Sequence, residues 1–355
     1  MVLTDPLDTL ARRFFHFDHW AGASPLGDGN INDTYRIDVQ KNGSDCSFVL
    51  QRLNHAVFRQ PEAVMENIRR VTAYLAGQTD FDLIAPAPLQ TLDGHPFFLD
   101  GAGNYWRVFP FLKNTFAPER VASPEVAREA ARAYGVFARE LRNFPADSLV
   151  ETIPGFHDTN RRWTVFEQTL KADPAQRVAS AQAEIEGLWA AKKIFDHIHY
   201  LKTSGLLPMR VTHNDTKAGN VLLDSTTGRA VAVIDLDTVM PGTVLSDFGD
   251  MVRTFVPDRY EDDPDTENLC LRTDILDALT EGFLAETDGM LTRPEREHLL
   301  LGAQWIIGEQ ALRFLTDYLA GDVYYKTRYA EHNLVRARNQ LAVLREVSRN
   351  VIPAK

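Results

Sequence analysis

Short alternating runs of apolar and polar residues mark the first third of the chain. Across residues 32–39, tyrosine, isoleucine and valine alternate with charged side chains, and a second apolar run covers Phe48–Leu53. Alternation with a period of two is typical of strands, and the turn-forming residues at 41–45 predict a β-hairpin between the two runs. We expect further strands near residues 97–99 and 105–109.

Helical spacing replaces this alternation later in the chain. The pattern predicts helices over residues 61–77, from residue 123 onward, over 292–319 and over 331–349. The third of these begins with a capping-box pattern, in which Thr292 precedes Glu295 by three residues. We expect that box to open one long apolar helix.

The change of pattern predicts an α+β fold with two lobes. Residues 1–110 form a small, β-rich N-lobe, and residues 111–355 form a larger helical C-lobe. The Phe-Pro-Phe-Leu run at the junction suggests a hinge near residues 110–112. A chain of this length buries a large core without disulfides or metals.

Composition and charge narrow the class of protein. Of 355 residues, 44% are hydrophobic and 25% charged, which is typical of a globular protein rather than a disordered or fibrous one. The formal net charge of −11 disfavours nucleic acid as a partner. Two distant cysteines indicate neither a disulfide framework nor a cysteine metal site, and fit a reducing compartment. We expect no membrane partner, no secretory signal and a cytoplasmic location, and leave the oligomeric state open.

Residues 211–237 carry the pattern with the most chemical content. It reads H-x-D-x-K-x-x-N, then two short apolar strands joined by a turn, with an acid after the second. Asp215 suits proton abstraction from an acceptor hydroxyl, and Lys217 suits neutralisation of a transferred phosphoryl group. Asn220 and Asp235 offer oxygen ligands for Mg²⁺. The joint spacing favours ATP-dependent phosphoryl transfer over an ordinary hairpin with polar residues at its mouth.

This segment resembles the catalytic core of the kinase-like phosphotransferases that include aminoglycoside phosphotransferases and choline kinases. The resemblance implies a bilobal protein-kinase-like fold and gives His213 the task of packing and positioning the loop. Asp247 opens a D-F-G sequence, but it lies 32 residues beyond Asp215. The resemblance therefore assigns the metal to Asp235, and Asp247 to bracing the catalytic loop.

The same resemblance implies a nucleotide site in the N-lobe. Gly27, Gly29 and Asn32 precede the first predicted strand, where small residues let backbone N–H groups approach a phosphate. The backbone around Phe109 and Phe111 is expected to bind the adenine edge at the hinge.

One position departs from the kinase pattern. Gln51 stands where the second strand of a kinase carries a lysine for the nucleotide phosphates. Glu62 and Glu66, on the following helix, then have no assured partner. Either Arg52 or another base compensates for the missing charge, or nucleotide affinity is modest.

A closer resemblance extends along nearly the whole chain, to the N-acetylhexosamine 1-kinases of this superfamily. Glutamine in place of the lysine is itself a feature of that group. The similar segments, in order, are residues 27–35, 50–51, 106–108, 156–159, 211–217, 234–242, 247–250, 313–322 and 331–336.

Those enzymes transfer the γ-phosphate of ATP to the anomeric hydroxyl of GlcNAc or GalNAc. The resemblance makes Asp215 the base that acts on this hydroxyl. It places the sugar near Asn30, Asn214, Asp235, Arg313 and Tyr324. Asn30 stands where a histidine is expected in that family, at a position that faces the sugar.

Two other functions are open. The first is a kinase of another small alcohol, such as a different sugar, an aminoglycoside or choline, and a cationic acceptor would need the acidic stretch at 258–267. The second is a pseudokinase that binds nucleotide without turnover, which only Gln51 supports. A metal hydrolase is weaker still, since the pairs His16/His19 and His197/His199 have no third ligand nearby.

Overall fold

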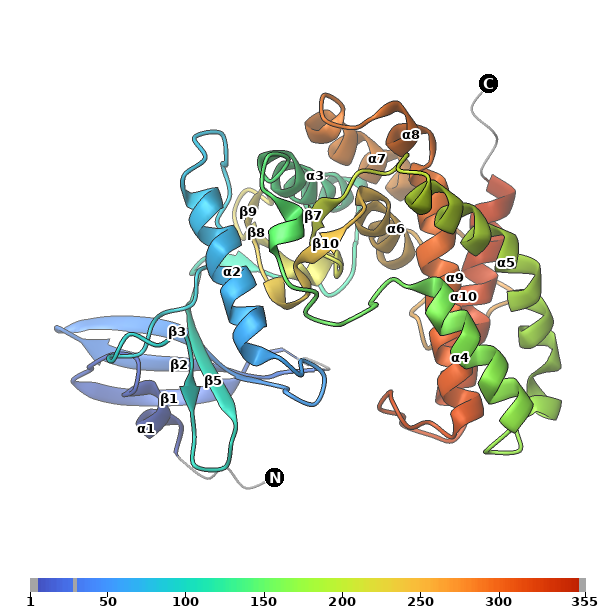
Figure 1. Cartoon of the computed structure of the whole chain (residues 1–355). Helices are drawn as coiled ribbons and strands as arrows, with labels where there is room; N and C mark the ends of the chain where they lie inside the picture. Colours follow the sequence, from blue (N-terminus) through green and yellow to red (C-terminus); the bar gives the residue numbers. More distant parts are fainter. Residues whose placement is uncertain (1–5, 28–30, 351–355) are drawn as a thin grey trace.

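A five-stranded antiparallel sheet forms the N-lobe of the computed structural model, which describes residues 6–27 and 31–350. Figure 1 shows this sheet at one end of the molecule, with the short helix α1 (Leu7–Ala11) beside it. The strand order in the sheet is β1 (His19–Pro25), β2 (Asp33–Lys41), β3 (Ser44–Leu53), β5 (Tyr105–Pro110) and β4 (Phe98–Leu99).

The predicted hairpin is confirmed, and one strand of this sheet was missed. β2 and β3 pair antiparallel with Lys41 opposite Ser44, so the turn is tight. β1 was not predicted from the sequence, because its pairing register with β2 shifts between Trp20 and Gly22. An irregularity of this kind interrupts the period of two on which the prediction depends.

Two hydrophobic cores hold the molecule together. The smaller one lies under the sheet and includes Phe15, Ile37 and Trp106. The larger one fills the C-lobe, and the apolar face of α2 (Pro61–Ala76) packs into it. Although α2 precedes the hinge in sequence, it is therefore anchored to the C-lobe core, and Figure 1 shows it between the sheet and the C-lobe helices.

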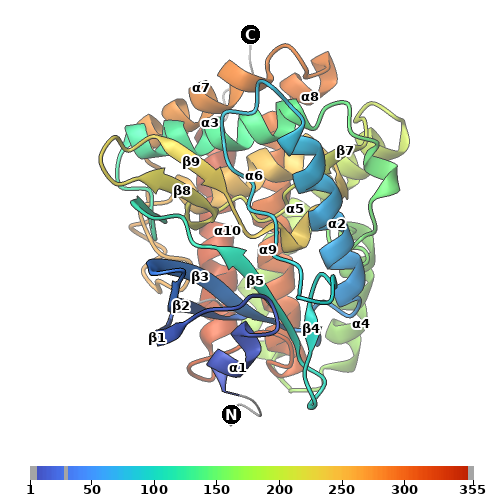
Figure 2. The same ribbon diagram turned by 90° about the vertical axis from the view of Figure 1, so that its left-hand side faces the viewer.

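Helices make up most of the C-lobe (Figure 2). They are α3 (Pro124–Glu140), α4 (Thr159–Ala172), α5 (Gln182–Thr203), α6 (Val244–Phe255), α7 (Thr273–Thr287), α8 (Arg293–Glu297), α9 (Leu299–Ala320) and α10 (His332–Asn350). The central helix is α9, which contacts α4, α5, α6, α8 and α10. α6 and α9 approach so closely that a Cβ on Gly249 would lie 2.4 Å from the backbone oxygen of Gly302. These features confirm the expected α+β class.

The single long helix expected from residue 292 is wrong. The capping box is present, with the Thr292 side chain and the Glu295 backbone paired as predicted. However, His298 adopts φ −113° and ψ 10°, and its ring Nδ1 lies 2.6 Å from the Pro294 carbonyl oxygen. The chain therefore forms two helices, α8 and α9, which meet at His298.

Short strands carry the catalytic segment. β8 (Val221–Asp224) and β9 (Ala230–Val233) form the predicted second hairpin, and β6 (Thr115–Phe116) joins β8 soon after the chain leaves β5. β7 (Arg210–Thr212) and β10 (Met240–Gly242) form a separate pair. Across residues 6–27 and 31–350, no helix has the length and apolar character needed to cross a bilayer.

Candidate active site

Two acids of α6 hold the catalytic loop that follows β7. The Asp247 carboxylate accepts the backbone N–H groups of His213 and Asn214, both at 2.8 Å. Asp250 accepts the backbone N–H of Thr216, also at 2.8 Å. Because Asp247 is buried, its pKa is raised to about 6. The D-F-G aspartate thus lies against loop backbone, the position that the resemblance gave it.

The His213 ring is wedged inside the loop. Its Nε2 lies 3.0 Å from the Ile234 carbonyl oxygen, and its Nδ1 accepts the backbone N–H of Asp215 at 3.3 Å. The ring makes T-shaped contacts with the rings of Tyr134 and Phe137, at interplanar angles of 79° and 67°. With its ring nitrogens engaged and no exposure to solvent, His213 positions the backbone of Asp215.

Three polar side chains of the loop converge on one another. Lys217 Nζ lies 3.0 Å from Asp215 Oδ2, and Asn220 Nδ2 donates to the same oxygen at 2.8 Å. Burial alone would raise the pKa of Asp215, but the charges of Lys217 and His213 and the hydrogen bonds from Lys217 and Asn220 together lower this pKa. The same pairing raises the pKa of Lys217. Asp215 is therefore held as a carboxylate that can receive a proton.

Asp235 sits in a backbone conformation that few non-glycine residues adopt, with φ 60° and ψ 57°. Burial, together with the charge of Asp237, raises its pKa to about 7. Asn220 lies in the same cleft, and since its Nδ2 faces Asp215, its Oδ1 is left to accept or ligate. One carboxylate and one amide oxygen, completed by water and phosphate, are a donor set that suits Mg²⁺.

The sequence analysis missed two residues that support this loop. The Tyr134 hydroxyl donates to the Lys217 carbonyl oxygen at 2.8 Å. Arg253 pairs with Asp250 at 2.8 Å and with Glu261 at 2.7 Å. The available signal for the second was an arginine three residues after an acid, but no helix was predicted over α6.

A cleft of about 690 Å³ lies between the lobes and adjoins the loop. The expected nucleotide residues Gly27, Gln51, Phe109 and Phe111 line it, as do Lys217, Asn220 and Asp235. Asn32 instead turns its side chain to Asp237, to which it donates at 2.8 Å. Gly29 and Asn30 lie outside the described residues.

The cation nearest Gln51 comes from the neighbouring strand. Arg107, directly opposite Gln51 in the β3–β5 ladder, is 1% exposed and lines the cleft. Its Nε and Nη2 donate to Gln51 Oε1 at 3.0 and 2.7 Å, and its Nη1 pairs with Asp237 at 2.6 Å. The alternative, Arg52, pairs with Asp33 and is not part of the cleft lining.

The acids of α2 make other contacts. Glu66 pairs with Arg69 on the same helix at 2.6 Å. Glu62 accepts the hydroxyl of Tyr105 at 3.2 Å. The buried acid that meets the N-lobe cation is therefore Asp237, from the segment that follows the proposed metal ligand.

Among the residues expected to bind the acceptor substrate, Arg313 has the side-chain environment best suited to a ligand. Its guanidinium lies over the rings of Phe156 and Tyr325, 5.3 and 5.6 Å from their centres. Its Nη1 donates to Gln310, but its buried Nε has no hydrogen-bond partner among the described residues. A buried donor without a partner is costly, so this nitrogen is suited to a bound ligand.

Tyr324 lies on a loop that a buried acid holds in place. The Asp317 carboxylate accepts the backbone N–H groups of Val323, Tyr324 and Tyr325 at 2.8–2.9 Å, and the side chain of Asn333 at 2.9 Å. The Tyr324 side chain is 60% exposed. The loop backbone is thus fixed while this ring remains accessible.

Asn214 is more enclosed than expected. Its Nδ2 donates to the Thr238 carbonyl oxygen at 2.9 Å, and its Oδ1 accepts from Ser246 at 3.3 Å. It is 6% exposed. In this arrangement its amide braces the loop, and a contact with an acceptor would require these hydrogen bonds to break.

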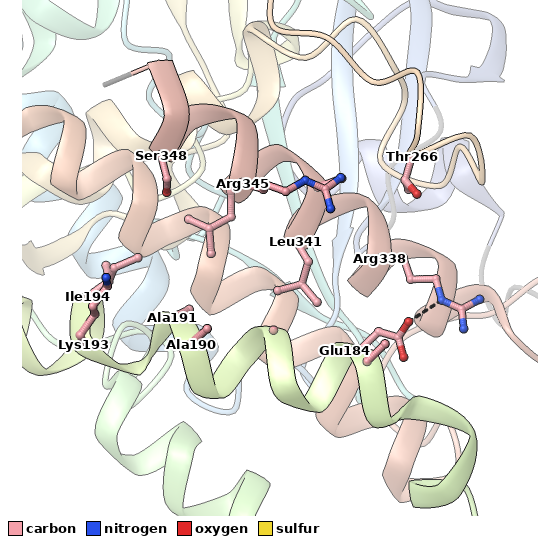
Figure 3. Close-up of a pocket in the computed structure, with 14 residues that line it drawn as sticks. Glu184, Ala190, Ala191, Lys193, Ile194, Thr266, Arg338, Leu341, Arg345 and Ser348 are labelled. Carbon is pink, nitrogen blue, oxygen red and sulfur yellow. Dashed lines mark hydrogen bonds and ion pairs between the residues drawn. The ribbon is translucent and has the colours of Figure 1, made fainter. Parts of the chain in front are cut away.

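A second hollow, of about 630 Å³, lies between α5 and α10 (Figure 3). Its floor is made of small and aliphatic side chains such as Ala191 and Leu341. At its rim Arg338 donates to Glu184 at 2.7 Å, as the dashed line in Figure 3 marks. None of its lining residues belongs to the catalytic loop or to the cleft between the lobes.

Comparison with known proteins decides the family. The model of the phosphotransferase enzyme family matches residues 22–269. The chain belongs to this family. The match covers the whole catalytic segment and most of the sheet, so it includes every residue proposed for the base, the metal and the nucleotide.

Solved structures of phosphotransferases share the fold. An aminoglycoside phosphotransferase from Alicyclobacillus acidocaldarius superposes with a TM-score of 0.63 at 15% identity, covering 99% of this chain and 97% of its own. A microcompartment-associated aminopropanol kinase gives 0.62 at 17% identity, covering 96% and 97%. Choline kinase from Cryptosporidium parvum gives 0.57 at 12%, covering 94% and 91%. The expected bilobal kinase-like fold is confirmed.

Proposed function

We propose that this phosphotransferase is an ATP- and Mg²⁺-dependent kinase that phosphorylates the anomeric hydroxyl of an N-acetylhexosamine. The observation that carries the kinase chemistry is the convergence of Lys217 and Asn220 on Asp215. The choice of sugar rests on the sequence resemblance and on the Arg313 region. A spectinomycin phosphotransferase of the same fold was solved with ADP, which supports nucleotide use.

Each side chain of the loop has a role in the proposed reaction. Asp215, kept ionised by Lys217, orients the acceptor hydroxyl and receives its proton. Lys217 also neutralises negative charge on the transferred phosphoryl group. Asn220 and Asp235 would hold Mg²⁺, which supplies charge neutralisation at the ATP phosphates when bound.

The acceptor is proposed to bind between the loop and α9. Arg253 interacts electrostatically with both Asp215 and Arg313, which supports placing the acceptor between them. The unpartnered Arg313 Nε and the exposed Tyr324 ring offer a donor and an apolar face. Sugars present hydroxyl and carbonyl acceptors together with apolar faces, and an N-acetyl carbonyl suits such a donor.

The charges near the site argue against a strongly cationic acceptor. The acidic stretch at 258–267 is largely neutralised, because Glu261 pairs with Arg253, and Asp265 with Arg259 at 3.1 Å. An aminoglycoside-like polycation would need unpaired carboxylates. A neutral hydroxyl compound therefore fits this region better. Aminopropanol and choline kinases share the fold, so other small alcohols remain the second candidate.

The test is ADP release with Mg²⁺-ATP against a panel of GlcNAc, GalNAc, glucose, galactose, choline and kanamycin. We expect an N-acetylhexosamine to stimulate release above the other acceptors and to yield an acid-labile phosphate. Stimulation by choline or kanamycin alone would replace the sugar assignment. ATP consumption that no acceptor stimulates would favour the pseudokinase.

A further inference from the structure

The N-lobe of this protein has Gln51 at the position where a kinase carries the lysine for the nucleotide phosphates. Gln51 and Arg107 are cross-strand partners on β3 and β5, and both line the cleft. Arginine has only donors, so two of its N–H groups fix the Gln51 oxygen toward it. The orientation of the Gln51 amide is therefore decided by Arg107.

With its oxygen held by Arg107, the Gln51 amide presents its nitrogen, Nε2, as a donor in a fixed orientation. Gln51 Nε2 donates one N–H to the Thr34 hydroxyl at 3.0 Å, and Thr34 also lines the cleft. Among the described residues no acceptor takes the second N–H. A glutamine whose oxygen is held by a guanidinium is also polarised, because hydrogen bonds in a chain strengthen one another.

Asp237 holds the arginine in turn. Its carboxylate accepts hydrogen bonds from Arg107 Nη2 at 2.9 Å and from Asn32 Nδ2 at 2.8 Å. The Arg107 and Asp237 side chains are both almost fully buried. Asp237 follows the proposed metal ligand Asp235 by two residues, so this pair links the sheet to the phosphate end of the cleft. Such a pair costs desolvation free energy, and that favours a specific task over simple stabilisation.

We propose that Gln51 and Arg107 act as one unit in place of the lysine, in which Gln51 donates its amide N–H to a nucleotide phosphate and Arg107 positions and polarises that amide. The inference rests on the proposed use of ATP. It adds two positioning residues to the site, Arg107 and Asp237.

The test measures Mg²⁺-ADP binding by calorimetry and the KM for ATP in matched variants. Gln51→Glu keeps both acceptor contacts to Arg107 but cannot donate, and Gln51→Met removes both functions without adding charge. We expect each to weaken Mg²⁺-ADP binding at least tenfold while the melting temperature stays near that of the wild type. Arg52→Gln, on the same strand, is the control and should bind as the wild type does.

Arg107→Gln alone would leave Asp237 buried without its partner and could unfold the protein. The double variant Arg107→Gln/Asp237→Asn leaves no unpaired charge buried, because it removes both members of the ion pair. If the pair is only a structural support, this double variant will fold and bind nucleotide normally; we expect it to fold and to bind at least tenfold more weakly.

The outcomes separate the two claims. If the wild type binds no Mg²⁺-ADP, the proposed function and this inference both fall. If the wild type binds and both Gln51 variants bind within threefold of it, only the inference is overturned.

Discussion

The catalytic loop and the proposed acceptor region of the C-lobe are both held by buried acids. They differ in whether their polar side chains have hydrogen-bond partners. Buried acids of α6, Asp247 and Asp250, accept loop N–H groups, and Asp317 of α9 does the same for the loop that carries Tyr324. In the catalytic loop the polar side chains then satisfy one another around Asp215. In the acceptor region the buried Nε of Arg313 has no partner in the described chain. The proposed catalytic groups are thus held by one another, whereas the proposed acceptor region retains a donor without a partner among the described residues.

The largest effect is expected at the base. Asp215→Asn retains the shape of the side chain but cannot receive the proton, so kcat should fall roughly 10²–10⁴-fold with nucleotide binding preserved. Steady-state ADP release together with Mg²⁺-ADP calorimetry measures both. Near-normal turnover in a folded variant would remove Asp215 from the mechanism.

The next effect concerns the metal. Asp235→Ala removes the carboxylate proposed to hold Mg²⁺, and we expect the Mg²⁺-dependent part of nucleotide affinity to disappear. Calorimetry with ADP, with and without Mg²⁺, tests this. Asp196→Asn is a control that should change nothing, because this exposed position of α5 pairs only with Lys192 among the described residues. An unaltered Mg²⁺ dependence in Asp235→Ala would place the metal elsewhere.

A smaller and selective effect is expected on the acceptor side. In the wild type, the two carboxylate oxygens of Asp317 accept three backbone N–H groups of the Tyr324 loop. Asp317→Asn leaves only one accepting oxygen for these donors, so we expect the loop to be held less firmly. We expect the KM for the acceptor to rise about tenfold while the KM for ATP changes little, since buried charged hydrogen bonds contribute about 1.5–3 kcal/mol each. Equal changes in both KM values would show that the two regions are not separable in this way.

The smallest effect on activity is expected at Glu309, which anchors the segment carrying Phe156. The change expected there is in stability, and it depends on pH. Burial alone would raise its pKa, but His157 at 2.8 Å, with Arg162 and Thr159, lowers it to about 2. The pKa is depressed on folding, so the stabilisation is present above about pH 4.5 and is lost as the pH falls toward 2. This pKa shift contributes at most about 3 kcal/mol to the free energy of unfolding.

Glu309→Gln should therefore be less stable than the wild type at pH 7 and should lose less stability between pH 5 and 2. Urea unfolding at several pH values measures this, with the exposed Glu297→Gln as the matched control. A variant that keeps the pH slope of the wild type would contradict the assigned ion pair.

The two regions also differ in how far the sequence predicts them. The base, the lysine, the asparagine and Asp235 lie within 21 residues, so their spacing could be recognised from the sequence alone. The hairpin of β2 and β3 was predictable for the same reason, because its pattern is local. The break between α8 and α9 was not, since it depends on the backbone of one residue, His298.

Contacts between distant segments were beyond the sequence pattern. Arg107 and Asp237 are 130 residues apart, and only the fold brings them together. Arg253 and Tyr134 support the loop from α6 and α3, and no spacing rule connects them to it. Side-chain partners chosen by tertiary packing are the part of a site that periodicity does not encode.

The most direct test of the central claim is the position of the phosphate in the product formed from GlcNAc or GalNAc. Phosphorus–proton NMR of the reaction mixture identifies the proton coupled to phosphorus. The account predicts coupling to the anomeric proton, in wild-type reactions and not in Asp215→Asn. Coupling to protons at another ring carbon, or a phosphorylated product from a non-sugar alcohol alone, would contradict it.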